Sequence, residues 1–206
     1  SSMSVLSKQG SAQADEQGVV AMLQRGERGL IEQAERLGME WTILRPTLIY
    51  GAGIDRSITP IVQRALRLRV FPIPLADGLR QPVHADDIAR AVLAAITTGA
   101  ASARVLEIGG GERLPYHAMF RRVHASLVQP TLALPLPAGA LRGLAAVLPR
   151  ARGPVSRLQQ DLIADNGPLQ ALLGVHPRPF QPDAGTWQPM SATQALQRIA
   201  AHPGNS

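Results

Sequence analysis

A helical repeat that leads directly into a short apolar run most constrains the fold of this chain. Between residues 19 and 37 apolar side chains recur with the period of an α-helix, and Gly38 supplies a C-terminal stop. The next apolar run, 41–44, is rich in strand formers and ends at Arg45-Pro46. An amphipathic helix followed at once by a buried strand is typical of α/β proteins, so we predict an α/β fold.

The stretch from Gly51 to Gly78 interrupts this alternation. It carries glycines, prolines and a basic, partly helical middle at 59–68, so it resembles an insertion. A second helix follows, which we expect Asp86 or Asp87 to cap. Its predicted apolar face consists of Ile88, Ala91, Val92, Ala95 and Ile96, and Gly99 closes it.

The rest of the chain is predicted to contain one more strand and then mainly helices. The strand covers Arg104 to Ile108, and a helix is marked by Met119, Phe120, Val123 and Leu127. Proline-rich connections follow, and we expect no second series of strands. We therefore divide the chain into an α/β unit at 1–110, with an insertion at about 52–80, and a mostly helical unit at 111–206.

Composition excludes several kinds of site. The 206 residues contain no cysteine, so a disulfide or thiolate metal site cannot form, which fits a cytoplasmic location. The five histidines are scattered without ligand spacing, and we predict no metal. The net charge is +6, but few aromatic residues are available to stack on bases, so we do not expect nucleic-acid binding.

From the sequence we also expect no membrane contact. The apolar stretch 127–148 is broken by three prolines and carries Arg142, so it fails as a spanning helix. The arginine-flanked segment Ala138 to Arg152 has two readings: packing inside the helical unit, which we favour, or docking on a partner or membrane surface. The polar segment Ser7 to Gln17 is predicted to be a mobile loop.

Two glycine clusters could suggest a phosphate-binding loop. Gly51 and Gly53 form one cluster, and 109–111 forms the other. A dinucleotide fingerprint needs three spaced glycines between a first strand and its helix, with an acidic residue about 20 positions later. Neither cluster meets these conditions, so we interpret both as turn glycines.

Three successive segments resemble a known family. They are Leu44-Arg45-Pro46-Thr47-Leu48-Ile49-Tyr50-Gly51, then Arg80-Gln81-Pro82-Val83-His84-Ala85-Asp86-Asp87-Ile88-Ala89, then Leu106-Glu107-Ile108-Gly109-Gly110-Gly111-Glu112. In this order and spacing they resemble signatures of the extended short-chain dehydrogenases/reductases, in particular the NAD(P)-dependent nucleotide-sugar epimerases and dehydratases. Asp165-Asn166 and the later Leu172-Leu173-Gly174-Val175 resemble the family's closing pattern.

The resemblance implies a fold and a set of binding residues. The implied fold is the C-terminal part of a Rossmann-type parallel sheet plus a small, mostly helical substrate domain. Pro46, Thr47 and Leu48 match backbone positions near the nicotinamide ring of NAD or NADP, although Arg45 and Pro46 could equally only end a strand and pair with a neighbour. Arg80 matches the arginine that binds the diphosphate of a nucleotide sugar.

The catalytic residues of the family are only partly matched. The family uses a serine, a tyrosine that acts as acid or base, and a lysine that lowers the pKa of that tyrosine. Ser2 matches the serine, whereas the tyrosine and lysine positions fall on Val19 and Leu23, which cannot transfer a proton. Tyr50, Tyr116 and Lys8 offer no ready substitute pair.

Two functions remain open. One is an NAD(P)-dependent epimerase/dehydratase-like protein that acts on a nucleotide sugar or related metabolite. The alternative is a noncatalytic NAD(P)-binding sensor or assembly factor that binds a protein partner. A Rossmann fold needs a glycine-rich turn to hold the pyrophosphate, so we expect cofactor binding only together with a missing N-terminal segment, and a homodimer is one expected assembly.

Overall fold

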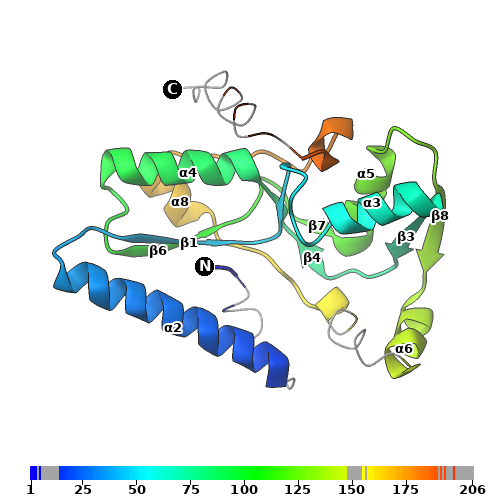
Figure 1. The fold of residues 1–206 in the computed structure, drawn as a ribbon, viewed down its shortest axis with the longest axis horizontal. Coiled ribbons are helices and arrows are strands. Elements are labelled where there is room, and N and C mark those ends of the chain that lie inside the picture. The colour runs from blue at the N-terminus through cyan, green and yellow to red at the C-terminus, as the bar shows by residue number, and fades with distance from the viewer. Residues whose placement is uncertain are drawn as a thin grey trace.

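The computed structural model describes residues 1–3, 5, 14–147, 155, 157–189, 191, 193 and 197. Helices and parallel strand pairs form an α/β arrangement, so the predicted fold class is confirmed (Figure 1). The helices are α2 (Ala14–Arg36), α3 (Thr59–Leu68), α4 (Ala85–Thr98), α5 (Tyr116–Ala125), α6 (Ala138–Val147) and α8 (Gly167–Leu173), with 3-10 turns η2 (Arg157–Gln159) and η3 (Ala184–Trp187). The strands are β1 (Thr42–Pro46), β2 (Ile49–Tyr50), β3 (Val70–Pro74), β4 (Leu79–Arg80), β5 (Val83–His84), β6 (Arg104–Ile108), β7 (Leu114–Pro115) and β8 (Leu132–Leu136).

The β1–β6 pair lies at the middle of one half of the molecule, between two layers of helices. The two strands run parallel, with Ile43 opposite Val105 and Pro46 opposite Ile108. Helix α2 lies on one side of the pair, and α4 and α8 lie on the other (Figure 1). A core of Leu106, Ile108, Leu169 and other apolar residues fills the space between the strands and the α4–α8 layer. This layering is what a Rossmann-type half sheet requires.

The other end of the molecule is built around the parallel pair β3–β8. Phe71 and Ile73 of β3 point into a core that also contains Phe120 and Val123 of α5. The predicted helices at 59–68 and around Met119 are confirmed. Our expectation of no second series of strands is wrong, because β7 and β8 both follow β6. The hydrophobic pattern does not predict β8, because two leucines occupy its exposed side where a half-buried strand carries polar residues, and a third residue is a proline.

Several helix predictions need correction. Helix α2 begins at Ala14, so the C-terminal part of the predicted loop 7–17 is helical, and residues 6–13 lie outside the described part of the chain. Val92 and Ile96 of α4 are exposed, and the face that packs is Ile88, Ala91 and Ala95. Among the described residues, no helix is long and apolar enough to cross a membrane.

Candidate functional site

Two parallel strands end side by side and define the candidate site. Pro46 ends β1 directly opposite Ile108, which ends β6. The N–H of Thr47 donates to the carbonyl oxygen of Ile108 at 3.0 Å, which holds Thr47 at the mouth of the pair. Ligands of open α/β sheets bind beyond the carboxyl ends of such strands.

The start of the chain lies at this edge. The N–H of Met3 donates to the carbonyl oxygen of Pro46 at 3.0 Å, and the N–H of Val5 donates to that of Ser2 at 3.1 Å. Ser2 is partly exposed there. The structure therefore brings Ser2 beside Pro46, while the catalytic role of Ser2 stays a prediction.

A second segment runs alongside Thr47 and Leu48. The Thr47 hydroxyl donates to the carbonyl oxygen of Gln81, and the N–H of Val83 donates to that of Leu48 at 2.9 Å. Arg80 directly precedes Gln81, so the three segments that carry the five predicted residues adjoin one another, although the Arg80 side chain itself bonds to Leu79 and Gln160. Sequence separation gives no hint of these contacts.

Arg80 is not a solvated surface residue. Only 6% of it is exposed. Its Nη1 donates to the carbonyl oxygens of Leu79 at 2.8 Å and Gln160 at 2.6 Å. The guanidinium carbon lies 4.7 Å from the centre of the Tyr116 ring, a cation–π distance. These contacts fix the position of the guanidinium.

Two amide side chains brace the glycine turn after β6. Gln81 donates from Nε2 to the Gly110 carbonyl oxygen at 2.8 Å and accepts from the Ala164 N–H at 2.8 Å. The Asn166 amide accepts from the N–H of Gly109 at 2.9 Å and donates to its carbonyl oxygen at 3.0 Å. Both residues lie within the sequence motifs, but the motifs predict no role for either, because their partners lie up to 83 positions away.

The glycine turn does not form a phosphate cradle. Its three N–H groups donate to Asn166 Oδ1, the Gln81 carbonyl oxygen and the Arg178 carbonyl oxygen. A Cβ on Gly110 would lie 2.0 Å from the carbonyl oxygen of Pro82, so only glycine permits this approach of two backbones. The interpretation of this cluster as turn glycines is confirmed.

Arg45 forms a bidentate ion pair with Glu27 of α2. Its Nε and Nη2 donate to the two carboxylate oxygens at 2.9 and 2.6 Å. The hydrogen bond from Arg45 holds the pKa of Glu27 below its ordinary value, and Glu27 raises the pKa of Arg45. The expectation that Arg45 pairs with a neighbour is confirmed, and the pair fastens α2 to the end of β1.

Tyr50 is poorly suited to proton transfer. Tyr50 is buried between Phe180 and His84, with ring centroids 4.7 and 5.0 Å away. Burial raises the pKa of Tyr50 to about 12, so its phenol stays neutral at ordinary pH. Tyr116 lies against the Arg80 guanidinium, and Val19 is exposed on α2. Lys8 lies outside the described residues.

The expected cap of α4 is wrong. His84 is the N-cap residue, and its Nδ1 accepts from the Asp86 N–H at 3.1 Å. Asp87 is fully buried and accepts instead from the N–H and Nε of Arg178, at 3.0 and 3.1 Å, and from Arg90. Asp87 therefore clamps the C-terminal segment onto α4, a contact across 91 positions that the sequence does not reveal.

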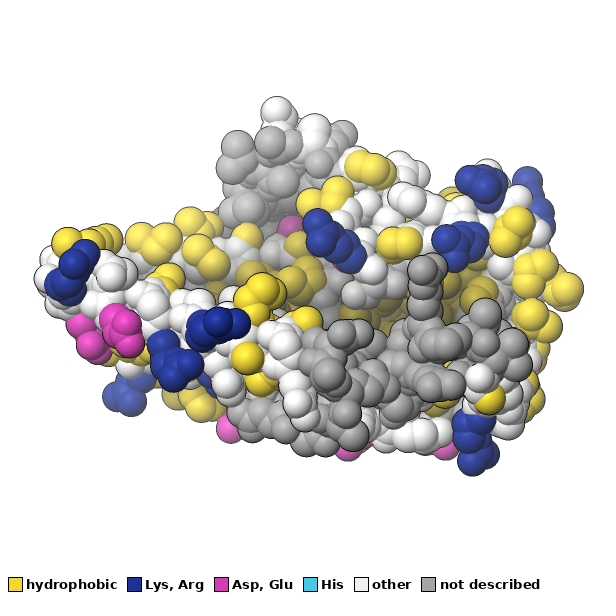
Figure 2. Space-filling model, turned by 60° about the horizontal axis from the view of Figure 1, so that its bottom comes forward, with side chains coloured by type: hydrophobic (Ala, Val, Ile, Leu, Met, Phe, Trp, Pro, Cys, Tyr) yellow, Lys and Arg dark blue, Asp and Glu magenta, His cyan; other side chains and the backbone are white. Residues whose placement is uncertain are grey.

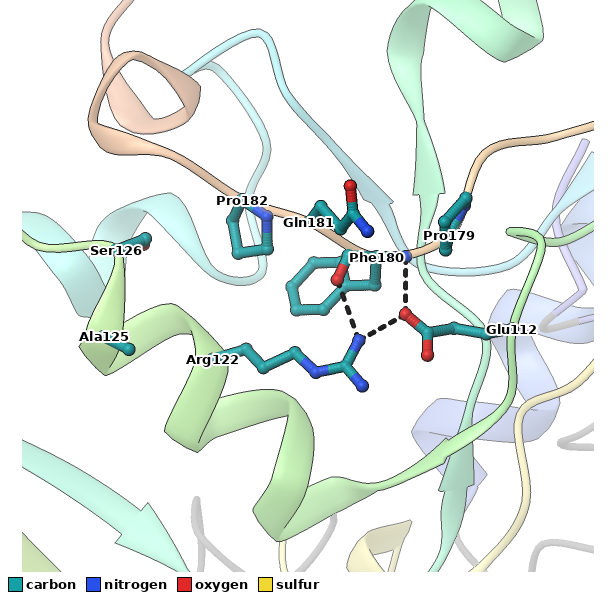
Figure 3. Close-up of a pocket in the computed structure, with 8 residues that line it drawn as sticks. All are labelled: Glu112, Arg122, Ala125, Ser126, Pro179, Phe180, Gln181 and Pro182. Atoms are coloured by element: carbon teal, nitrogen blue, oxygen red, sulfur yellow. Dashed lines mark hydrogen bonds and ion pairs between the residues drawn. The ribbon is translucent and has the colours of Figure 1, made fainter.

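A hollow of about 480 Å³ lies beside this clamp and is lined by Glu112, Arg122 and Phe180 among others (Figure 3). Glu112 accepts from the Phe180 N–H at 2.8 Å, and Arg122 donates to the Phe180 carbonyl oxygen at 2.9 Å. Glu112 and Arg122 also pair with each other. These groups hold the C-terminal segment against α5. Among described residues, no group of three His, Cys, Asp or Glu side chains could hold a metal.

Comparison with known proteins agrees with this architecture. Residues 24–109 match the sequence model described as "NAD dependent epimerase/dehydratase family". An uncharacterized protein of Mycobacterium tuberculosis is 31% identical over 100 residues, which are 48% of this chain and 11% of that protein. UDP-glucose 4-epimerase of Vibrio cholerae is 25% identical over 114 residues, 54% of this chain and 34% of the enzyme.

The fold is similar to that of a solved structure over nearly the whole chain. It is a mutant UDP-glucuronic acid 4-epimerase from Bacillus cereus in complex with UDP-4-deoxy-4-fluoro-glucuronic acid and NAD. It superposes with a TM-score of 0.59 at 15% identity, over 98% of this chain and 60% of that chain. The chain thus corresponds to only part of the length of each of these proteins.

The fold and the edge of the β1–β6 pair define part of a Rossmann-type α/β protein. Residues 24–109, which are less than half of the chain, resemble the NAD-dependent epimerase/dehydratase family.

Proposed function

We propose that this chain forms the substrate-facing part of an NAD(P)-dependent epimerase or dehydratase that acts on a nucleotide sugar. The observation that carries the proposal is the network at the carboxyl edge of β1 and β6, which joins Ser2, Pro46–Leu48 and Arg80–Gln81. The family match to residues 24–109 and the UDP-sugar epimerases among its relatives support the same class of substrate.

Pro46–Leu48 would contact the nicotinamide end of a bound cofactor. The Thr47 N–H already donates to Ile108, so this segment offers a fixed apolar wall rather than a new hydrogen bond. The N–H groups of Gly109–Gly111 are also taken, and the 206 residues contain no G-x-G-x-x-G turn. We therefore propose that pyrophosphate binding needs such a turn from a preceding segment.

Arg80 would supply positive charge to the diphosphate of the nucleotide sugar. Its bonds to the carbonyl oxygens of Leu79 and Gln160 hold the guanidinium in place before a ligand arrives. A preorganised arginine loses little side-chain entropy on binding. The bound nicotinamide would exchange hydride with the sugar, while Arg80 orients the diphosphate.

The test is isothermal titration into the longer protein that includes a glycine-rich segment, with this 206-residue chain as control. NAD, NADP and UDP-glucose are titrated separately. We expect NAD or NADP to bind only the longer protein, and Arg80→Gln to weaken UDP-glucose binding about tenfold while leaving cofactor affinity unchanged. Absence of cofactor binding to both proteins would overturn the proposal.

A noncatalytic role is the second candidate, because the tyrosine and lysine positions of the family fall on Val19 and Leu23. Neither side chain can exchange a proton with the sugar. The double substitution Val19→Tyr with Leu23→Lys in the longer protein separates the two functions. Epimerase or dehydratase turnover that appears only in this variant supports a binding role for the natural protein, and turnover already present before substitution contradicts it.

A further inference from the structure

Charge is divided unevenly between two parts of the chain. Residues 56–76 and 113–160 together contain eleven arginines and no aspartate or glutamate. The remaining residues carry the other ten basic side chains and all fifteen acidic ones. These two segments therefore sum to a formal charge of +11 and the rest of the chain to −5. Three acidic residues that border the segments, Asp55, Asp77 and Glu112, contact α3 and α5 and offset part of this charge. Such segregation is a property of surfaces that meet a charged partner.

The fold brings the two basic segments together. Strand β3 comes from the first segment and β8 from the second, and they pair in parallel with Val70 opposite Leu132. The N–H of Leu132 donates to the carbonyl oxygen of Arg69 at 2.8 Å. We call the lobe formed by α3, β3, α5 and β8 the basic lobe. It lies at the opposite end from the β1–β6 pair (Figure 1).

The outer face of the β3–β8 pair is apolar. Because side chains alternate along a strand, the burial of Phe71 and Ile73 in the core turns Val70 and Pro72 outward. Their partners in register are Leu132 and Leu134. Leu132 is 68% exposed and Leu134 is 45% exposed, so two leucines of an edge strand face solvent. Such contiguous exposed apolar surface marks an interaction site.

Three exposed arginines follow one another along the C-terminal half of α3 and the turn into β3. They are Arg64, Arg67 and Arg69, and none forms an ion pair with a described residue. The backbone of Arg69 bonds to Leu132, and Leu68 and Val128 are also exposed. Figure 2 shows hydrophobic side chains along the right-hand edge of the molecule with basic side chains next to them, and both basic and acidic side chains at the left-hand end.

We propose that the basic lobe docks on an anionic membrane surface, with Leu132 and Leu134 inserted among the headgroups and Arg64, Arg67 and Arg69 bound to lipid phosphates. Aliphatic side chains flanked by unpaired arginines suit the interface of an anionic bilayer. The described exposed apolar residues include no aromatic ring, which disfavours base stacking on nucleic acid. Self-association through this face would bring two strongly positive lobes together.

This docking differs from the membrane span that the sequence excludes. Prolines break the stretch 127–148 as a spanning helix, but an edge strand needs only to lie in the interface. Helix α6, which follows β8 directly, lies below the basic lobe in Figure 1 and carries exposed Arg142. The proposal is independent of the proposed enzymatic function, because none of these residues belongs to the candidate site.

The test is flotation of the 206-residue chain with vesicles of pure phosphatidylcholine or of phosphatidylcholine with 30% phosphatidylglycerol, at low and high salt. We expect binding only to the anionic vesicles, and its loss at about 0.5 M NaCl. Each basic residue near an anionic surface contributes roughly a factor of five, so Arg64→Gln/Arg67→Gln/Arg69→Gln should weaken partitioning about a hundredfold.

Matched variants distinguish binding through the basic lobe from a general effect of charge or exposed hydrophobic residues. Leu132→Ser/Leu134→Ser should weaken binding by at least about tenfold, whereas Val92→Ser/Ile96→Ser, which changes two similarly exposed residues of α4, should not. Arg28→Gln/Arg36→Gln/Arg104→Gln is the charge-matched control. Thermal unfolding verifies that each variant is folded. The proposal is overturned if the chain binds neutral vesicles as tightly as anionic ones, or if the control variants lose as much vesicle binding as the test variants. Binding to RNA without binding to vesicles would also overturn it.

Discussion

The buried carboxylate Asp87 should stabilise this fold far more than its neighbour Asp86. Asp87 has no exposed surface and accepts hydrogen bonds from the Arg178 backbone N–H, the Arg178 guanidinium and Arg90. Asp86 is partly exposed and meets Arg178 only at 3.6 Å. Asp87→Asn keeps the shape of the side chain but removes its charge and replaces one acceptor oxygen with an amide donor.

The expected loss follows from the bonds that Asp87 accepts. A hydrogen bond to a charged group contributes about 1.5–3 kcal/mol, and Asn weakens the two bonds from guanidinium groups. Both arginines are partly exposed, so the lower end of that range applies and the loss is about 3 kcal/mol. At about 2–4 °C per kcal/mol for a chain of this size, the melting temperature should fall by about 6–12 °C.

Urea unfolding followed by circular dichroism measures this loss, with Asp86→Asn as the matched control. We expect less than about 1 kcal/mol from the control. The double variant Asp87→Asn/Arg178→Gln should be less destabilised than the two single changes added together, because they share one interaction. If Asp87→Asn costs no more than Asp86→Asn, the clamp of the C-terminal segment is not held by this charge.

Three further outcomes follow from other contacts. Glu27→Gln should lower the free energy of unfolding by about 1 kcal/mol at pH 7. Because the pKa of Glu27 is lowered in the folded state, its pairing stabilises the fold above pH 4.5, and this stability is lost as pH falls through the folded-state pKa. Urea unfolding at a series of pH values should therefore show a smaller loss of stability in acid for the variant than for the natural chain. Tyr50→Phe should reduce the loss of stability at alkaline pH. Because the pKa of Tyr50 is raised to about 12, its burial stabilises the fold fully below about pH 10, and this stability is lost as pH rises through the folded-state pKa. Absorbance at 295 nm follows the ionisation of the phenol. Gly110→Ala places a Cβ 2.0 Å from a backbone oxygen and should lower the melting temperature by several degrees, whereas Gly26→Ala, with open space around it, should raise it slightly.

The sequence predicted the elements whose signals are local. The helical period of α2 with its stop at Gly38, the helix at Thr59–Leu68 and the strand Arg104–Ile108 all follow from neighbouring residues, and each is present. The three segments 44–51, 80–89 and 106–112 indicated the family through their order and spacing. The glycines after β6 were also interpreted correctly, since a fingerprint depends on spacing that they lack.

Contacts between distant segments could not be predicted in this way. The motif predicts a binding role for Arg80, but nothing near it in the sequence predicts its contacts with Gln160 and Tyr116. Asp87 reads as a helix cap until Arg178 arrives from 91 positions away. Local pattern specifies backbone conformation, whereas burial and ion pairing depend on which segments the chain folds together, and that choice sets the free energy of each polar group.

The sequence by itself therefore determined the α/β class, the family resemblance and the absence of a dinucleotide fingerprint, because periodicity, spacing and composition carry these properties. It also determined the uneven distribution of arginine along the chain. Only the tertiary structure decided that β3 and β8 unite the two basic segments and turn Leu132 and Leu134 to solvent. The physical reason is that a surface exists only where segments far apart in the chain are packed side by side.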